Sequence, residues 1–123
     1  GLSILGTCAG MICLAKRISD SGNCIKETLS LMDIEVKRNA FGRQVDSFEA
    51  ELAVPALGQK SFHGVFIRAP IIENVGAQVE VLCKLPDGTM VAARQDKLVV
   101  VAFHPELTSD TRFHRYFLKI AAS

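Results

Sequence analysis

The stretch Leu2-Ser3-Ile4-Leu5-Gly6-Thr7-Cys8-Ala9-Gly10 places a cysteine between an apolar run and an amphipathic segment. We expect a strand over residues 2–5 and a helix over residues 9–18. In a Gly-x-nucleophile-x-Gly elbow, small residues allow a sharp turn, and the backbone N–H after the nucleophile points at the reacting centre. Cys8 would then be the nucleophile, with the Ala9 N–H as an oxyanion donor, and the helix N-terminus would favour the thiolate. Taken alone, the elbow also fits a small buried cysteine at a tight turn.

A second motif, near the end of the chain, supplies a base and a carboxylate. The apolar run over residues 98–103 is followed by His104-Pro105-Glu106. If that run is a buried parallel strand, His104 and Glu106 lie at its carboxyl end, where open α/β sheets hold their sites. Pro105 has a fixed φ and would hold the two side chains in one relation. Cys8, His104 and Glu106 are therefore candidate catalytic residues, against the alternative that His104 is an ordinary core histidine.

Composition excludes several classes of function. The 123 residues suffice for one domain or part of one, with 49% hydrophobic residues and a net charge of +1. Basic residues are interspersed with acidic ones, so no stripe predicts nucleic-acid binding. No apolar run reaches the roughly 18 residues of a membrane-spanning helix, and nothing at the start resembles a signal peptide. We therefore expect a soluble, cytoplasmic protein that binds neither nucleic acid nor membrane.

The four cysteines predict neither a metal site nor a disulfide framework. Cys8, Cys13, Cys24 and Cys83 form no Cys-x-x-Cys pair, and no paired histidines have zinc-type spacing. Reduced thiols suit a cytosolic enzyme. Cys13 and Cys83 lie in apolar runs and are expected to be packing residues.

Hydrophobic periodicity and turn signals predict the remaining elements. Strands are expected over residues 33–37, 47–54, 64–67, 80–85 and 90–94, with a hairpin turn at Pro86-Asp87-Gly88-Thr89 between the last two. A terminal helix is expected over residues 110–121, capped by Ser109 or Asp110.

Together the two motifs resemble the triad of class I glutamine amidotransferases. Two further strings, Arg38-Asn39-Ala40-Phe41-Gly42-Arg43-Gln44 and Phe66-Ile67-Arg68-Ala69-Pro70, resemble more specifically the glutaminase subunits of pyridoxal 5'-phosphate synthases. The similarity runs nearly end to end, so residues 1–123 are expected to be a partial glutaminase domain. The resemblance implies an α/β fold of three layers, flavodoxin-like, with a mixed central sheet and an antiparallel insertion.

The resemblance also implies roles for named residues. Cys8, His104 and Glu106 would form the triad, and Ala9 the oxyanion donor. Arg38, Ile67 and Arg68 would bind L-glutamine, although each arginine could instead be an ordinary surface charge. No cofactor or metal is implied. The partner would be a (β/α)8-barrel synthase subunit that receives ammonia for pyridoxal phosphate synthesis. The alternatives are a glutaminase of another pathway or an inactive module that only binds a partner.

The beginning of the chain is unusual for such a domain. Only seven residues precede Cys8, and there is no initiating methionine. An elbow strand normally follows other strands of the sheet, and similar proteins carry a Gly-Gly-Glu-Ser loop that gives a second oxyanion donor. We expect this chain to be the C-terminal two-thirds of the domain and to be inactive by itself.

Overall fold

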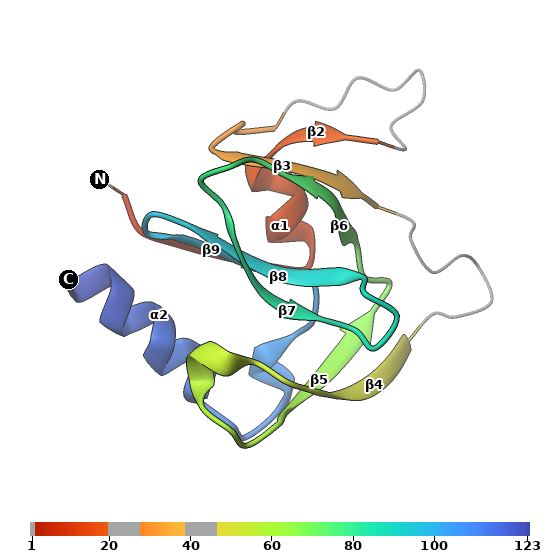
Figure 1. The fold of residues 1–123 in the computed structure, drawn as a ribbon, viewed down its shortest axis with the longest axis vertical. Helices are drawn as coiled ribbons and strands as arrows, with labels where there is room; N and C mark the ends of the chain where they lie inside the picture. The colour runs from red at the N-terminus through yellow and green to blue at the C-terminus, as the bar shows by residue number, and fades with distance from the viewer. Residues whose placement is uncertain (1, 20–27, 39–46) are drawn as a thin grey trace.

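The computed structural model describes residues 2–19, 28–38 and 47–123, and its centre is a mixed β-sheet (Figure 1). In chain order the elements are β1 (Ile4–Thr7), α1 (Ala9–Leu14), β2 (Ala15–Ile18), β3 (Met32–Lys37), β4 (Ser47–Leu52), the 3-10 helix η1 (Pro55–Leu57), β5 (Phe62–Ile67), β6 (Ile71–Val75), β7 (Glu80–Lys84), β8 (Met90–Gln95), β9 (Leu98–Val101), the 3-10 helix η2 (Pro105–Leu107) and α2 (Arg112–Ala122).

Parallel pairing of β1 with β9 places the first strand of the chain beside the last (Figure 1). Ile4 lies opposite Leu98, and Thr7 lies opposite Val101. The ladder continues past β1, because the Cys8 N–H donates to the Val101 carbonyl oxygen at 2.8 Å. The apolar run of β9 is buried, as expected for a parallel strand covered on both faces. The predicted buried parallel strand is confirmed, although it ends at Val101 rather than at residue 103.

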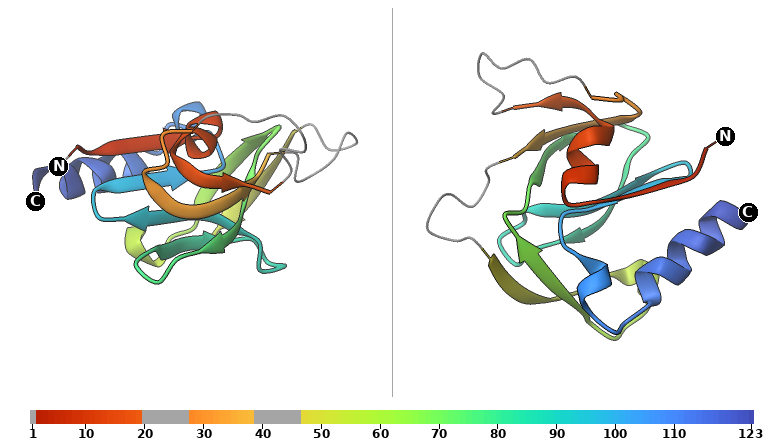
Figure 2. Two further views of the ribbon diagram at one scale, coloured as in Figure 1. Left: turned by 90° about the horizontal axis from the view of Figure 1, so that it is seen from above. Right: turned by 180° about the vertical axis from the view of Figure 1, so that it is seen from behind.

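The main sheet combines parallel and antiparallel pairs. Its strand order is β1-β9-β8-β6-β3-β2, and β7 pairs with β8 off this path. The β1–β9 and β2–β3 pairs are parallel, whereas the pairs that join β3, β6, β7, β8 and β9 are antiparallel. The sheet curls strongly, as both views of Figure 2 show. The expected mixed sheet is confirmed.

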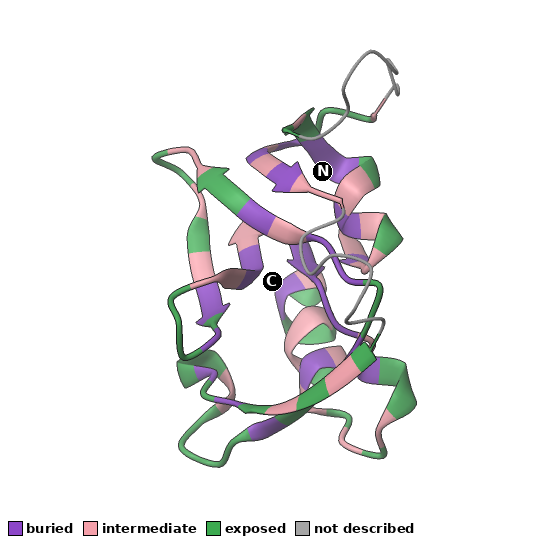
Figure 3. Cartoon of the chain, turned by 90° about the vertical axis from the view of Figure 1, so that its right-hand side faces the viewer, coloured by how far each residue is buried: buried purple, intermediate pink, exposed green. Residues whose placement is uncertain are grey.

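The antiparallel hairpin of β4 and β5 forms a second, two-stranded sheet. Its register runs from Ser47 opposite Ile67 to Leu52 opposite Phe62. Alternate residues of β5 are buried, so one face of the hairpin packs on the domain and the other faces solvent (Figure 3). This hairpin is the antiparallel insertion that the sequence resemblance implies.

Four buried phenylalanines join the hairpin to the rest of the domain. Phe62 and Phe66 come from β5, Phe103 follows β9, and Phe113 belongs to α2. Ring centroids of the contacting pairs lie between 5.0 and 5.7 Å apart, mostly edge to face. Aromatic contacts of this kind add about 0.5–1.5 kcal/mol per pair to the burial of the rings. The cluster therefore holds β5 against the carboxyl end of β9.

The first helix, β2 and β6 differ from the sequence prediction. The first helix ends at Leu14 instead of residue 18, because residues 15–18 form β2 and pair in parallel with β3. These inter-strand bonds override a helical periodicity, as tertiary context often does. The sequence does not predict β6, in which Glu73 and Asn74 have low β-propensity.

The terminal helix begins later than predicted. Its N-cap is Thr111 rather than Ser109 or Asp110, and the Thr111 side chain makes no capping bond. Asp110 Oδ1 instead accepts the Arg112 N–H at 3.0 Å. The predicted hairpin turn is confirmed, with Leu85 N–H bonded to the Thr89 carbonyl at 2.8 Å and Gly88 at φ +92°. Among the described residues, no helix has the length and apolarity needed to cross a membrane.

Gly6 and Gly10 provide a matched test of the elbow. A Cβ on Gly6 would lie 2.9 Å from the backbone carbon and oxygen of Gly10, whereas a Cβ on Gly10 would meet nothing within 4 Å. We expect Gly6→Ala to lower the free energy of unfolding by about 1–3 kcal/mol, because backbone must move. Gly10→Ala should be neutral or stabilising by up to about 1 kcal/mol, because alanine favours helix. Denaturant unfolding of both variants in the full-length protein measures this, and equal stabilities would contradict the close approach of β1 and α1.

Candidate active site

Cys8 occupies a strained turn between β1 and α1. Its φ of 51° and ψ of −105° lie outside the regions that residues with side chains normally adopt. Two backbone hydrogen bonds hold this conformation. The Cys8 N–H donates to the Val101 carbonyl, and the Cys8 carbonyl accepts from the Met11 N–H at 3.0 Å. Strain of about 1–3 kcal/mol that neighbouring structure maintains is common at functional sites. The predicted elbow geometry is therefore present around the thiol.

His104 and Glu106 form a hydrogen-bonded unit directly after β9. The His104 Nδ1 lies 2.7 Å from Glu106 Oε2, and the side chains are 23% and 50% exposed. Pro105 starts η2, whose short turn carries Glu106 back beside the imidazole. A carboxylate at Nδ1 accepts a hydrogen bond from the N–H of that nitrogen and leaves Nε2 as the nitrogen available to a substrate or a nucleophile.

Glu106 is held in its ionised form. Partial burial opposes this, but hydrogen bonds from His104 and the Glu106 backbone, with the charges of His104 and His114, lower the pKa of Glu106 below its ordinary value. The carboxylate therefore remains charged at neutral pH. It can orient the imidazole and stabilise the imidazolium that forms when Nε2 takes a proton.

Strand β5 crosses the site and contacts both halves of it. The His104 N–H donates to the Val65 carbonyl at 2.8 Å, and the Cys8 Sγ donates to the Ile67 carbonyl at 3.6 Å. Within the described part of the chain, the hydrogen bond of the thiol goes to Ile67 and not to His104. Parallel pairing of β1 with β9 and the crossing of β5 thus gather Cys8, His104 and Glu106 at one edge of the sheet.

The thiol is protonated in this arrangement, contrary to the expected thiolate. Burial raises the pKa of Cys8 most, a hydrogen bond from the Ala9 backbone lowers it, and the charge of Glu106 raises it further. The net effect is a pKa above the ordinary thiol value. Helix α1 has only six residues, so its N-terminus gives less stabilisation of the anion than a longer helix would.

The candidate substrate-binding residues lie at the end of β5 and at the turn that follows it, next to the elbow. Ile67 is 40% exposed, and Arg68, next to it, is exposed with φ +46°. Arg38 directly follows β3, where Lys37 is paired with Ile71 at the start of β6. This register carries Arg38 to the turn that joins β5 to β6, which also contains Arg68. The structure thus brings Ile67 to the thiol and the two arginines to the adjoining turn.

Sequence reasoning missed the Val65 carbonyl that anchors the His104 backbone. The only available signal was the alternation over residues 64–67, which predicts a strand but not what it crosses. Arg43 and Gln44, in a string that carries the family resemblance, lie outside the described residues.

The other described cysteines have different surroundings. Cys83 is buried, as predicted, and burial raises its pKa to about 11. Cys13 is exposed, so the prediction that it packs in the core is wrong. The buried face of α1 is formed by Met11 and Leu14, and Cys13 lies on its exposed face. Cys24 lies outside the described residues. In residues 2–19, 28–38 and 47–123, no cluster of three His, Cys, Asp or Glu side chains could hold a metal ion.

Comparison with known proteins assigns the family. The model of the SNO glutamine amidotransferase family matches residues 1–123. The chain belongs to this family. It is 62% identical over 121 residues to the pyridoxal 5'-phosphate synthase subunit PdxT of Dehalococcoides mccartyi, covering 98% of this chain and 62% of the relative. It is 61% identical over 118 residues to PdxT of Herpetosiphon aurantiacus, covering 96% of this chain and 62% of that protein.

A solved structure supports the same assignment. A crystal structure of a glutamine amidotransferase matches with a TM-score of 0.88 at 51% identity, covering 99% of this chain and 62% of that one. The predicted class I glutamine amidotransferase fold, α/β with a mixed sheet, is confirmed. The chain spans about three-fifths of the length of the curated relatives it matches.

The raised pKa of Cys8 predicts a pH dependence of alkylation. Only the thiolate reacts, so the labelling rate of Cys8 in the full-length protein should rise with pH through a midpoint above the ordinary thiol value. Mass spectrometry after timed iodoacetamide pulses measures the rate at each cysteine. Cys83, with its pKa of about 11, is the internal control and should react only at higher pH. A midpoint near neutrality for Cys8 would contradict a protonated resting thiol.

Proposed function

We propose that residues 1–123 are part of a glutaminase domain that hydrolyses L-glutamine to glutamate and ammonia. The observation that carries this proposal is the meeting of a strained Cys8 elbow with the hydrogen-bonded His104–Glu106 pair at one sheet edge. A nucleophile, a base and an orienting carboxylate are the groups that amide hydrolysis through a covalent intermediate requires. Membership of the glutamine amidotransferase family supports glutamine as the amide.

The first half of the proposed reaction forms a thioester. His104 Nε2 takes the proton of the Cys8 thiol as Sγ attacks the side-chain amide carbon. This order follows from the raised pKa of Cys8, since no preformed thiolate is available. The Ala9 N–H stabilises the developing oxyanion. The imidazolium then protonates the leaving nitrogen, the C–N bond breaks, and ammonia departs.

The second half regenerates the enzyme. Neutral His104 takes a proton from water, and the hydroxide attacks the thioester carbon. The C–S bond breaks, glutamate leaves, and Cys8 recovers its proton from the imidazolium. Throughout, ionised Glu106 keeps Nδ1 protonated and leaves Nε2 as the nitrogen that acts as the base.

We propose that Arg38, Ile67 and Arg68 hold the amino-acid end of the substrate. Arg68 directly follows Ile67, whose carbonyl contacts Cys8. The register of β3 on β6 brings Arg38 to the same turn. A guanidinium suits the α-carboxylate, and a backbone carbonyl suits the α-ammonium group. Three-point fixing of the α-carbon would place the side-chain amide at the thiol.

We further propose that ammonia passes to the (β/α)8-barrel subunit of a pyridoxal 5'-phosphate synthase. The name of the PdxT relatives supports this partner over an amidotransferase of another pathway. A cytoplasmic location is proposed with it, because the free thiols of Cys8, Cys13 and Cys83 suit a reducing compartment.

Substitution of the triad tests the chemistry. In the full-length protein, Cys8→Ala should abolish glutamine hydrolysis, because no other group forms the thioester. Glu106→Gln should keep a measurable rate, lower by about 10²- to 10⁴-fold, because it perturbs only the orientation and charge of His104. Glutamate release measures both, and thermal melts control for folding. Wild-type activity in Cys8→Ala would reject the mechanism.

Arg68 allows a role in binding to be separated from backbone strain. Its φ of +46° suits glycine, so Arg68→Gly removes the guanidinium without adding strain, whereas Arg68→Ala retains the strain. Both variants should raise the KM for glutamine about 10- to 100-fold, the loss expected for one charge-assisted hydrogen bond. Steady-state kinetics with a thermal melt of each variant measures this. An unchanged KM in Arg68→Gly would show that the side chain does not bind substrate.

A titration with the synthase subunit tests gating by the partner. If docking completes the oxyanion geometry, glutamine hydrolysis should be slow without the synthase and should rise when the synthase is added. Glutamate release is measured across the titration. The Glu106→Gln variant, titrated in the same way, gives the glutamate release expected from an enzyme with an impaired triad. A flat rate while binding is confirmed separately would favour an independent glutaminase.

A further inference from the structure

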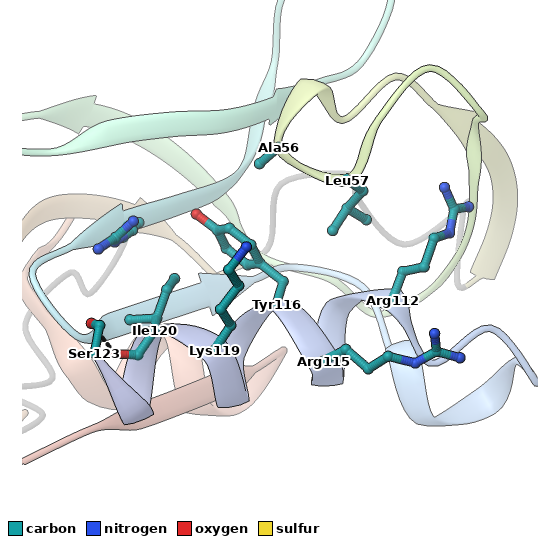
Figure 4. Close-up of a pocket in the computed structure, with 9 residues that line it drawn as sticks. Ala56, Leu57, Arg112, Arg115, Tyr116, Lys119, Ile120 and Ser123 are labelled. Atoms are coloured by element: carbon teal, nitrogen blue, oxygen red, sulfur yellow. Dashed lines mark hydrogen bonds between the residues drawn. The ribbon is translucent and has the colours of Figure 1, made fainter.

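A basic pocket lies away from the proposed active site, between α2, η1 and β8 (Figure 4). Its volume is about 470 Å³, within the range of small-molecule sites. The lining residues are Ala56 and Leu57 of η1, Arg94 of β8, and Arg112, Arg115, Tyr116, Lys119, Ile120 and Ser123 of α2 and its end. None of the residues proposed for glutamine hydrolysis is among them.

The charged side chains of this pocket are all cationic, and the Ser123 carboxylate at its edge accepts from Lys97 Nζ at 2.7 Å. Four cationic side chains line it, and no aspartate or glutamate does. Arg115 and Lys119 lie one helical turn apart, where like charges destabilise a helix by about 0.2–0.5 kcal/mol. Arg94 adds a third cation from the facing strand. A concave surface lined by one sign of charge concentrates ligands of the opposite sign.

Arg112 serves as the fixed wall of the pocket. Its guanidinium pairs with Asp110 at 2.6 Å and donates to the carbonyl oxygens of Lys60 and Ser61 at 2.8 and 2.7 Å. It also lies over the Phe62 ring, 5.7 Å from the centroid. With these partners it ties α2 to the segment before β5 and keeps little capacity for a ligand.

Three cations retain donors for a ligand. Arg94 Nε bonds to the Asp96 carbonyl at 2.8 Å, and Arg115 Nε bonds to Thr111 Oγ1 at 2.9 Å. Among the described residues, the Nη atoms of these arginines and Lys119 Nζ make no hydrogen bond within the protein. Each arginine is thus oriented by its Nε while its terminal donors stay available. Oriented guanidinium groups are suited to the oxygens of phosphate groups.

The remaining walls are apolar. Leu57, Ala56 and Ile120 border the cations, and the Tyr116 ring is braced by Phe113 at a centroid distance of 6.5 Å. We infer that this pocket binds a small phosphate monoester, with its phosphate among Arg94, Arg115 and Lys119 and its apolar body against Leu57 and Tyr116. A dianion matches three cations better than a monocarboxylate, and the apolar wall distinguishes an ester from free phosphate.

Calorimetric titration of the full-length protein tests this site. The probes are phenyl phosphate, inorganic phosphate and phenol. Phenyl phosphate should bind saturably and more tightly than inorganic phosphate, while phenol should not bind. No saturable binding of phenyl phosphate up to about 10 mM, a limit that corresponds to negligible affinity, would overturn the proposal. Inorganic phosphate binding as tightly as the ester would also overturn it, since the apolar wall would then contribute nothing.

Matched variants locate the binding. Arg94→Gln and the double variant Arg115→Gln/Lys119→Gln should each weaken phenyl phosphate about tenfold or more. Lys84→Gln is the control, since Lys84 is an exposed cation on β7 outside the pocket, and it should leave the affinity unchanged. Equal weakening in the control would indicate non-specific charge and reject the site. Glutamine hydrolysis, measured separately, is independent of this result.

Discussion

The parallel pairing of β1 with β9 is the constraint on which the site depends. It joins segments more than ninety residues apart and continues through the bond from the Cys8 N–H to the Val101 carbonyl. Because parallel strands end at the same edge, the elbow after β1 and the His104 turn after β9 must meet. A register slip of one residue would turn Val99 and Val101 to the opposite face and separate the thiol from the imidazole. The hydrogen bonds from the Cys8 N–H to the Val101 carbonyl and from the His104 N–H to the Val65 carbonyl oppose such a slip.

The hairpin of β4 and β5 supplies the second support. Phe62 and Phe66 pack against Phe103 and Phe113, so the same rings that stabilise the core hold β5 across the ends of β1 and β9. Two carbonyl groups of β5, those of Val65 and Ile67, then contact His104 and Cys8. Packing far from the reacting atoms thereby sets the positions of the groups proposed to do the chemistry.

The sequence predicts the parts of this site that local chemistry encodes. The elbow around Cys8 and the His104-Pro105-Glu106 turn follow from small residues, a fixed proline φ and an apolar run, and they were found without the structure. Contacts between distant segments were not accessible in the same way. Residues 15–18 have helical periodicity yet pair with β3, and the crossing of β5 over the elbow leaves no pattern within β5 itself. The thiol pKa was mispredicted too, because burial, the largest cause of its rise, depends on tertiary packing.

In the resting structure the base is already oriented, but the nucleophile is still protonated. The Cys8 thiol donates to the Ile67 carbonyl, an acceptor that stabilises the protonated form and would repel a thiolate. His104 is already oriented by Glu106, so the base is prepared while the nucleophile is held neutral. The carbonyl that holds the thiol belongs to the peptide preceding Arg68, whose backbone lies in the left-handed region. If Ile67 and Arg68 bind substrate as proposed, glutamine competes for that carbonyl, and its arrival frees the thiol to deliver its proton to His104. Substrate binding and activation of the nucleophile would then be one event, which limits attack by the thiol on other electrophiles.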